Sequence, residues 1–352
     1  MNNQLYSARE LAEAIRFSSD VRRPQVAATT AGLAAIRNHF YQNELLISQE
    51  VTPTLYERLQ AVYQRLFIPE VSVEAFVYAS PEMQASCLSD ETSECVVRFT
   101  SRLVETMSPQ EFEFVVGHEL GHFLLQHGEV EHDQKSLESF MQMRSREISA
   151  DRTGLIACNS LDAAIRAMMK LFSGLTEQHL NFDVGTFISQ LKNSSSNANE
   201  IASHPSMLVR CRALLWFSMS GYFGVDKKPS RETLAKIDES IEKDLHRYID
   251  GPIRNRIERA KENLSMWKMA REITEDKIFD KNEQRRFSEV FGEKTLASLK
   301  NFLQDIPGSR VQEALDERVR SASDELEVLI PSAFAEEVTK IECRVKDWLF
   351  RA

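Results

Sequence analysis

Two histidines and a glutamate with the spacing of a metal site stand in the run HELGH, which extends from His118 to His122. Four residues of an α-helix turn through about 400°, so both imidazoles project from one face about 6 Å apart. Two neutral imidazole nitrogens so placed can bind one Zn²⁺ at about 2.1 Å each. Glu119 is displaced by about 100° around the helix and can reach a metal-bound water. The pattern is typical of a zinc site with its own general base.

The flanking residues predict a largely buried helix over residues 108–128. It opens with the S-x-x-E pattern of a capping box, Ser108 to Glu111. Its apolar flanks argue against a surface helix whose histidines lie in solvent, because buried polar side chains need partners and a metal supplies them. Glycines at 117 and 121 weaken a helix by up to about 1 kcal/mol each. They indicate that another backbone or a substrate comes close.

A catalytic zinc site needs a third protein ligand and one open position. Leu125 and Gly128 stand where a metzincin would have its further glycine and histidine, and a thermolysin-like spacing leaves only Glu138 nearby. Glu147 and Asp151 are better candidates, because they lie four residues apart in a helical run and share a face. One can ligate the metal while the other accepts a hydrogen bond from a ligating imidazole. The acidic and histidine residues of 129–133 are weaker candidates, because they follow the helix.

HELGH followed by Glu147-Ile-Ser-Ala-Asp151-Arg152 resembles the HtpX-like and CAAX prenyl endopeptidase family of zinc metallopeptidases. The resemblance covers about residues 50–217. It implies one Zn²⁺ per chain, with Glu147 as the third zinc ligand and Asp151 supporting a ligand from behind. It also implies a zincin-like fold, in which a short sheet lies beside the HExxH helix and the Glu-bearing helix.

The same resemblance implies roles for residues outside the zinc motifs. The family's His-Pro-Ser followed by Arg matches His204 and Arg210, which would reach the active site and hold substrate or the oxyanion. Without the family, His204 reads more simply as a helix-start or core histidine. The family also places a substrate-binding edge strand upstream, where this chain has Gln84, Ala85 and Ser86. The sequence there departs from the Asn-Ala-Phe-like stretch that is common in the family.

The wider pattern predicts a mainly helical α+β protein. Segments 5–43 and 54–66 have helical patterns, whereas 73–79 and 95–100 are rich in β-forming residues. Helical patterns dominate from residue 108 onward.

Two polar breaks suggest how the helical part is divided, a Ser/Asn-rich loop at 192–203 and a second break at 224–230. We therefore expect a zinc metallopeptidase domain over residues 1–228, with its zinc motifs within 108–217. An all-α C-terminal domain of unknown role is expected over residues 229–352.

Composition narrows the class of protein. The chain has 352 residues, of which 42% are hydrophobic and 27% charged, as in ordinary globular proteins. Its net charge of -10 argues against nucleic acid as a partner. Five scattered cysteines indicate reduced thiols rather than a disulfide framework. The first thirty residues lack the apolar region of a signal peptide, and no apolar run approaches the roughly twenty residues of a membrane span. We expect a cytoplasmic protein without an integral membrane segment.

These observations predict a zinc-dependent metalloendopeptidase that hydrolyses soluble or unfolded proteins. Zinc lowers the pKa of a bound water toward about 7, and Glu119 would act as general base. The alternative is a catalytically weak or latent zinc-binding scaffold that acts through residues 229–352, where a protein partner could bind. The altered segment at Gln84–Cys87 favours the alternative. The intact Glu119 opposes it, because zinc binding does not require that residue.

Overall fold

The computed structural model of the chain describes residues 7–20, 30–69, 73–89, 94–127, 136–190, 205–223, 230–275 and 279–350. The chain forms two compact units, the first made of Met1–Lys135 with Phe140–Gly251 and the second of Ser136–Ser139 with Pro252–Ala352. The predicted boundary at residue 228 lies outside the described residues. Helix α10 (Arg231–Leu245), which follows that boundary, belongs to the first unit.

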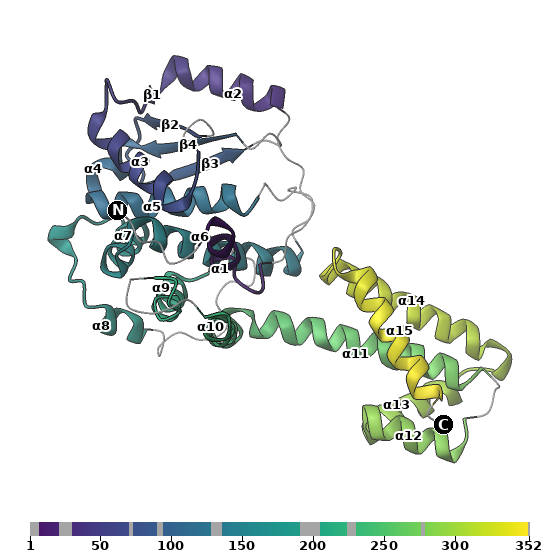
Figure 1. The fold of residues 1–352 in the computed structure, drawn as a ribbon. Coiled ribbons are helices and arrows are strands. Elements are labelled where there is room, and N and C mark those ends of the chain that lie inside the picture. The colour runs from purple at the N-terminus through teal and green to yellow at the C-terminus, as the bar shows by residue number, and fades with distance from the viewer. Residues whose placement is uncertain are drawn as a thin grey trace. The chain divides into compact units, whose positions relative to one another are not determined.

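A mixed four-stranded sheet lies in the first unit (Figure 1). Its strands are β1 (Leu45–Leu46), β2 (Val73–Tyr78), β3 (Ala85–Ser89) and β4 (Cys95–Thr100), in the order β1-β2-β4-β3. β2 and β4 are parallel, and β3 pairs antiparallel with β4, so β3 is an edge strand. The strands expected over 73–79 and 95–100 are confirmed, as is a mainly helical α+β fold.

Helices make up most of the rest of the first unit. Besides α10 and a short 3-10 helix at Glu177–His179, they are α1 (Ala8–Ile15), α2 (Thr30–Asn43), α3 (Pro53–Leu66), α4 (Ser101–Thr106), α5 (Pro109–Leu124), α6 (Leu137–Cys158), α7 (Leu161–Ser173), α8 (Val184–Ser189) and α9 (Met207–Phe217). The helix expected over 54–66 is confirmed as α3.

The prediction of one helix over residues 5–43 is wrong, because α1 and α2 are separate helices there. α1 ends at Ile15, and residues 16–20 are not helical. Serine and aspartate side chains compete for backbone hydrogen bonds and favour turns, and the chain has Ser18, Ser19 and Asp20 at this point. The backbone N–H of Phe17 donates to the hydroxyl of Ser149 on α6 instead of to a helical carbonyl (3.0 Å).

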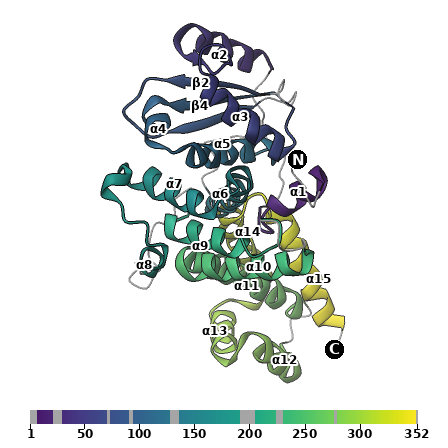
Figure 2. The same ribbon diagram turned by 60° about the vertical axis from the view of Figure 1, so that its left-hand side comes forward.

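Different helices cover the two faces of the sheet. Figures 1 and 2 both show α2 on one side of the strands and α5 on the other. Because side chains alternate along a strand, Phe76 of β2 packs against Phe40 of α2, while Phe99 of β4 packs against Phe112 of α5. The sheet thus supports α5 along one of its faces.

Small residues of α5 and α6 let the two helices pack closely where they meet. A Cβ added to Gly117 would overlap the Cβ of Ala157, and one added to Gly121 would lie 2.8 Å from Oγ1 of Thr153. The expectation that another backbone comes close to these glycines is confirmed, and the neighbour is α6. Since Gly117 directly precedes His118, this contact fixes how near the motif of α5 lies to the acidic residues of α6.

The second unit is helical throughout the part that the structure describes. Its helices are α11 (Gly251–Ile273), α12 (Lys281–Phe291), α13 (Glu293–Gln304), α14 (Val311–Leu329) and α15 (Phe334–Phe350), and a one-turn π-helix at His246–Asp250 precedes them. Leu264, Phe287, Leu315 and Ile341 are fully buried apolar side chains of this unit. None of the described helices, in either unit, combines the length and the hydropathy that crossing a bilayer requires.

We expect Gly117→Ala to lower the free energy of unfolding by about 1–3 kcal/mol, because the new methyl group forces α5 away from Ala157. Gly185→Ala in α8 is a matched control, since its added Cβ would meet Oδ1 of Asp183 at 3.4 Å, an ordinary contact. Chemical denaturation measures both. Equal stability of the two variants would contradict a tight contact between α5 and α6.

Candidate metal centre

α5 places the two histidines of the motif on one face. Ser108 and Glu111 form the expected capping box, in which each side chain accepts a hydrogen bond from the other residue's backbone N–H. The helix ends at Leu124, one turn before the expected end at residue 128, which lies outside the described residues together with 129–133. The ring centroids of His118 and His122 are 4.9 Å apart.

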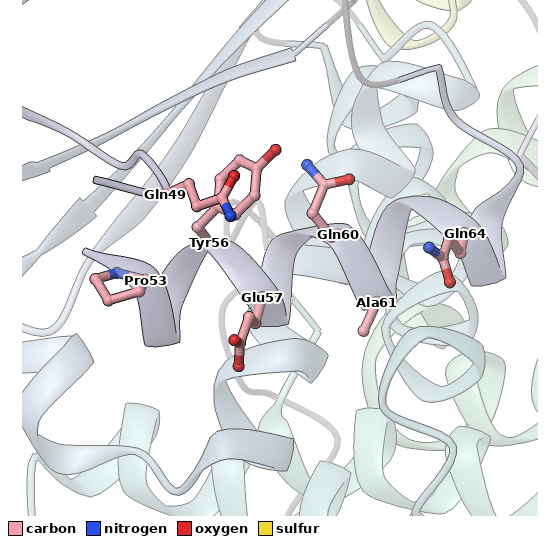
Figure 3. A pocket seen from close by; sticks show the side chains of 7 residues that line it. All are labelled: Gln49, Pro53, Tyr56, Glu57, Gln60, Ala61 and Gln64. Atoms are coloured by element: carbon pink, nitrogen blue, oxygen red, sulfur yellow. The ribbon is translucent and has the colours of Figure 1, made fainter. Parts of the chain in front are cut away.

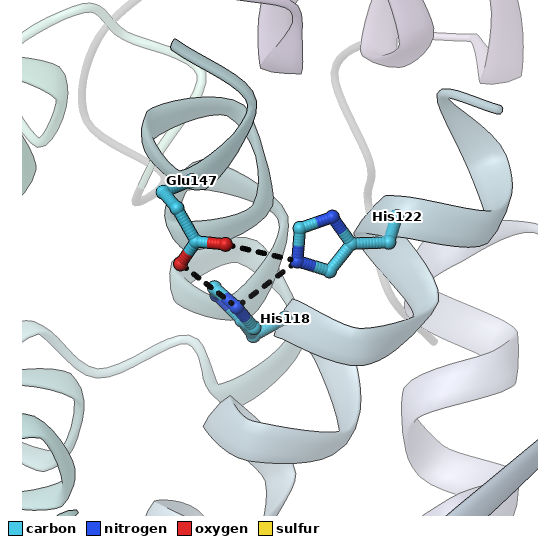
Figure 4. Close-up of side chains that lie close together, drawn as sticks. All are labelled: His118, His122 and Glu147. Carbon is cyan, nitrogen blue, oxygen red and sulfur yellow. Dashed lines mark hydrogen bonds and ion pairs between the residues drawn. The ribbon is translucent and has the colours of Figure 1, made fainter. Parts of the chain in front are cut away.

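Glu147 of α6 completes a three-residue cluster with these histidines (Figure 4). The Nε2 atoms of His118 and His122 are 3.3 Å apart. The carboxylate oxygens of Glu147 lie 3.6 Å from Nε2 of His118 and 3.5 Å from Nε2 of His122. Three ligand atoms at about 2.1 Å from one ion in tetrahedral arrangement are about 3.4 Å apart. The donor set and its spacing therefore fit one zinc ion.

Asp151 and Arg210 hold this cluster from behind. Nδ1 of His118 is 3.0 Å from Oδ1 of Asp151. Because an ionised carboxylate only accepts hydrogen bonds, His118 donates from Nδ1, and in its neutral form the ring then has its lone pair on Nε2, directed at the cluster. Arg210 of α9 donates to both oxygens of Asp151, at 2.8 and 2.6 Å, and its Nη1 lies 3.1 Å from Oε2 of Glu147.

The charges around the cluster tune its protonation. Burial raises the pKa of Asp151, but Arg210 and His118 outweigh burial and bring that pKa to about 2. Burial lowers the pKa of His118, and Asp151 and Glu147 more than compensate, so that pKa lies above its ordinary value. Burial lowers the pKa of His122 to about 3. His122 is therefore neutral at neutral pH, as a metal ligand must be.

The pKa of the Glu119 carboxyl group lies close to neutral pH. Burial raises its pKa from the ordinary 4.5 to about 7; the charge of His118 opposes the shift and that of Glu147 adds to it. The carboxyl group is thus poised for proton exchange beside the cluster.

The segment that carries this cluster matches the model of a known peptidase family. Residues 49–143 and 133–216 match peptidase family M48. No curated protein and no solved structure matches the chain. The M48 match includes the three cluster residues and also Glu119, Asp151 and Arg210. α1, α2 and residues 252–352 of the second unit lie outside it.

The residues predicted to bind substrate lie along an edge of the sheet in the M48-matching segment. Ala85 and Ser86 begin β3, and the backbone of Gln84, just before it, bonds to Thr100 at the end of β4. α5 packs against β3. The other side of β3 has no strand partner among the described residues. His204 lies outside the described residues, so its predicted role stays a prediction.

Sequence reasoning missed two residues behind His122. Nδ1 of His127 is 3.0 Å from Nδ1 of His122, and Nε2 of His127 is 2.8 Å from Oδ2 of Asp20. The available signal was a third histidine five residues beyond the motif, which the M48 match includes. No local pattern marked Asp20, since it falls in the segment expected to be helical.

A surface pocket of the first unit lies along α3 and does not include the cluster (Figure 3). Its lining residues are Gln49, Pro53, Tyr56, Glu57, Gln60, Ala61 and Gln64. Amide groups and a single carboxylate make no metal-binding set, so we assign this pocket no chemistry.

Asp151→Asn should weaken zinc binding about 10- to 100-fold, because the amide is a poorer acceptor for His118 and leaves Arg210 without its charged partner. Asp162→Asn is the control: Asp162 pairs with Arg166 on the surface, and exposed pairs contribute at most about 1 kcal/mol. Competition with a chromophoric chelator measures the affinity. If both variants bound zinc like the wild type, Asp151 would have no supporting role.

Replacing Glu119 should change the pH dependence of stability in the metal-free protein. Because its folded pKa of about 7 exceeds the ordinary 4.5, the folded state holds the proton more tightly, and stability falls as pH rises through this window. Glu119→Gln removes that loss. The variant should be more stable than wild type above pH 7, by roughly 3 kcal/mol at most, and the gain should vanish near pH 4. Urea denaturation with chelator at several pH values checks this; a pH-independent difference would contradict it.

Proposed function

We propose that this protein is a zinc-dependent metalloendopeptidase acting on soluble or unfolded proteins. The cluster of His118, His122 and Glu147 carries the proposal, because its donor atoms have the separations that one tetrahedral zinc ion requires. The M48 match supports metallopeptidase activity in general. In this proposal the cluster holds one Zn²⁺, and the first unit has a zincin-like active site similar to that of HtpX-like and CAAX prenyl endopeptidases.

Glu119 is the proposed general base and acid. Bound zinc would supply a Lewis acid that lowers the pKa of water toward about 7. Glu119 takes a proton from the attacking water and returns it to the leaving amine. Burial raises the pKa of Glu119 in the metal-free protein, and a bound cation would favour the ionised form that accepts the proton.

Asp151 and Arg210 act mainly through the ligands in this proposal. Asp151 orients His118, and Arg210 restrains the carboxylate of Glu147 while it neutralises Asp151. The resemblance also suggests that His204 and Arg210 donate to the oxyanion. For Arg210, its contacts with two carboxylates support the positioning role more directly.

The edge strand β3 is the proposed substrate-binding element, with Gln84, Ala85 and Ser86 nearest the bound chain. An extended peptide can add to an unpaired edge through backbone hydrogen bonds. The position of β3 relative to the general base supports this. α5, the helix that carries Glu119, packs against β3.

Glu119→Gln should retain zinc but cleave a denatured, fluorescently labelled protein about 10²- to 10⁴-fold more slowly, because the amide cannot accept the proton. Removal of the metal with a chelator should abolish cleavage by the wild type. Glu57→Gln, on the exposed side of α3, is the matched control and should cleave normally.

Metal analysis of each purified protein separates the outcomes of this experiment. Undiminished cleavage by zinc-loaded Glu119→Gln would contradict the role of Glu119 as general base. Zinc-loaded wild type that cleaves nothing would favour the alternative, a latent or catalytically weak scaffold acting through residues 229–352.

A further inference from the structure

The two histidines of the cluster are supported in different ways. Asp151 accepts directly from His118, whereas Nδ1 of His122 faces the ring of His127, which in turn faces Asp20. We propose that His127 and Asp20 are positioning residues that fix the tautomer and the orientation of His122. This proposal rests on the zinc site of the proposed function, but not on peptidase activity.

The chain of hydrogen bonds has only one consistent arrangement of protons for neutral rings. Asp20 accepts only, so Nε2 of His127 carries a proton and donates to it. Nδ1 of His127 then has a lone pair and accepts. His122 must therefore carry its proton on Nδ1, which leaves the lone pair of its Nε2 directed at His118 and Glu147. The carboxylate of Asp20 thus selects, through His127, the tautomer that binds a metal.

The end of α5 brings His127 back over the ring of His122. The N–H of Gln126 donates to the carbonyl of Phe123 (3.0 Å), and that of His127 donates to the carbonyl of His122 (2.8 Å). This pair of bonds is the Schellman motif, in which the residue after the helix end is left-handed. Gln126 has φ 57° there, a conformation that costs a non-glycine residue about 1–2 kcal/mol. The neighbouring structure therefore holds the turn in place.

Asp20 is held in place by α6, the helix that carries Glu147. The hydroxyl of Ser149 donates to Oδ2 of Asp20 (2.7 Å), and the amide of Gln142 donates to Oδ1 (3.2 Å). The side chains of His127 and Asp20 are only 2% and 1% exposed. Because burial excludes bulk water from this contact, no solvent molecule can easily replace the carboxylate as the acceptor for His127.

Arg16 connects the same segment to α5. One of its guanidinium nitrogens donates to the carbonyl of Leu125 at the end of α5 (2.9 Å), and another lies 3.5 Å from Oδ2 of Asp20. Residues 16–20 are therefore bound both to α5 and to α6. They precede the M48-matching segment, which begins at residue 49. A part of the chain outside the family match thus completes the support of a metal ligand.

Nitrogen NMR of the ¹⁵N-histidine-labelled, metal-free wild type tests the tautomer directly and needs no variant. We expect protonated Nδ1 and unprotonated Nε2 in His122, and the reverse in His127. A protonated Nε2 in His122 would overturn the proposal, whatever the activity of the protein.

Variants test the positioning role through zinc affinity, measured by chelator competition. His127→Leu and Asp20→Ala should each bind zinc about 10- to 100-fold more weakly. The double variant should bind no more weakly than His127→Leu alone, because Asp20 acts through His127. His127→Gln, whose amide oxygen can accept from His122, should recover most of the affinity. His179→Leu, on an exposed 3-10 helix, is the control.

The outcomes separate this proposal from the proposed function. Folded His127→Leu that binds zinc as tightly as wild type, or losses that multiply in the double variant, would overturn the positioning role. Wild type that binds zinc but has no peptidase activity would overturn only the proposed function. Wild type that binds no zinc would overturn both.

Discussion

The site depends on how closely α5 approaches α6. Zinc sites tolerate errors of about 0.2 Å in ligand distance, whereas a single added methyl group at Gly117 would overlap Ala157. The two glycines of α5 weaken that helix, and the close packing of its backbone against α6 offsets this cost. With the sheet behind α5, the contact brings Glu147 to the two imidazoles without any loop. These three side chains are therefore positioned by rigid elements, which preorganises them for the proposed metal.

The net negative charge of the site suits a divalent cation. Arg210 neutralises one of the two carboxylates that α6 contributes to the site, Glu147 and Asp151, and leaves one net negative charge, to which an ionised Glu119 would add another. The raised pKa of Glu119 reflects this burial and crowding in the metal-free protein. A bound cation of charge two would reverse the balance and favour the ionised form of Glu119. Arg210 thus limits the repulsion among the acids without removing their attraction for the metal.

Local spacing made most of the cluster predictable. His118, Glu119 and His122 lie within one helix, whose cap is also a local pattern, and Glu147 and Asp151 share a face of another. Three-dimensional contacts set the rest. His127 required knowing that α5 ends in a left-handed turn at Gln126, although no glycine marks that position. The strands β2 and β4 were predictable from their β-branched and aromatic residues, whereas the short strand β1 gave no such pattern.

Asp20, which the sequence did not reveal, supports His122 from a distant part of the chain because α6 offers no carboxylate on that side. α6 places Asp151 one turn after Glu147, beside His118, but toward Asp20 it offers the neutral side chains Gln142 and Ser149. The carboxylate that selects the tautomer of His122 must then come from another segment, and residues 16–20 supply it. Coupling between two binding events is reciprocal. If docking of this segment strengthens zinc binding, bound zinc must hold the segment in place by the same factor.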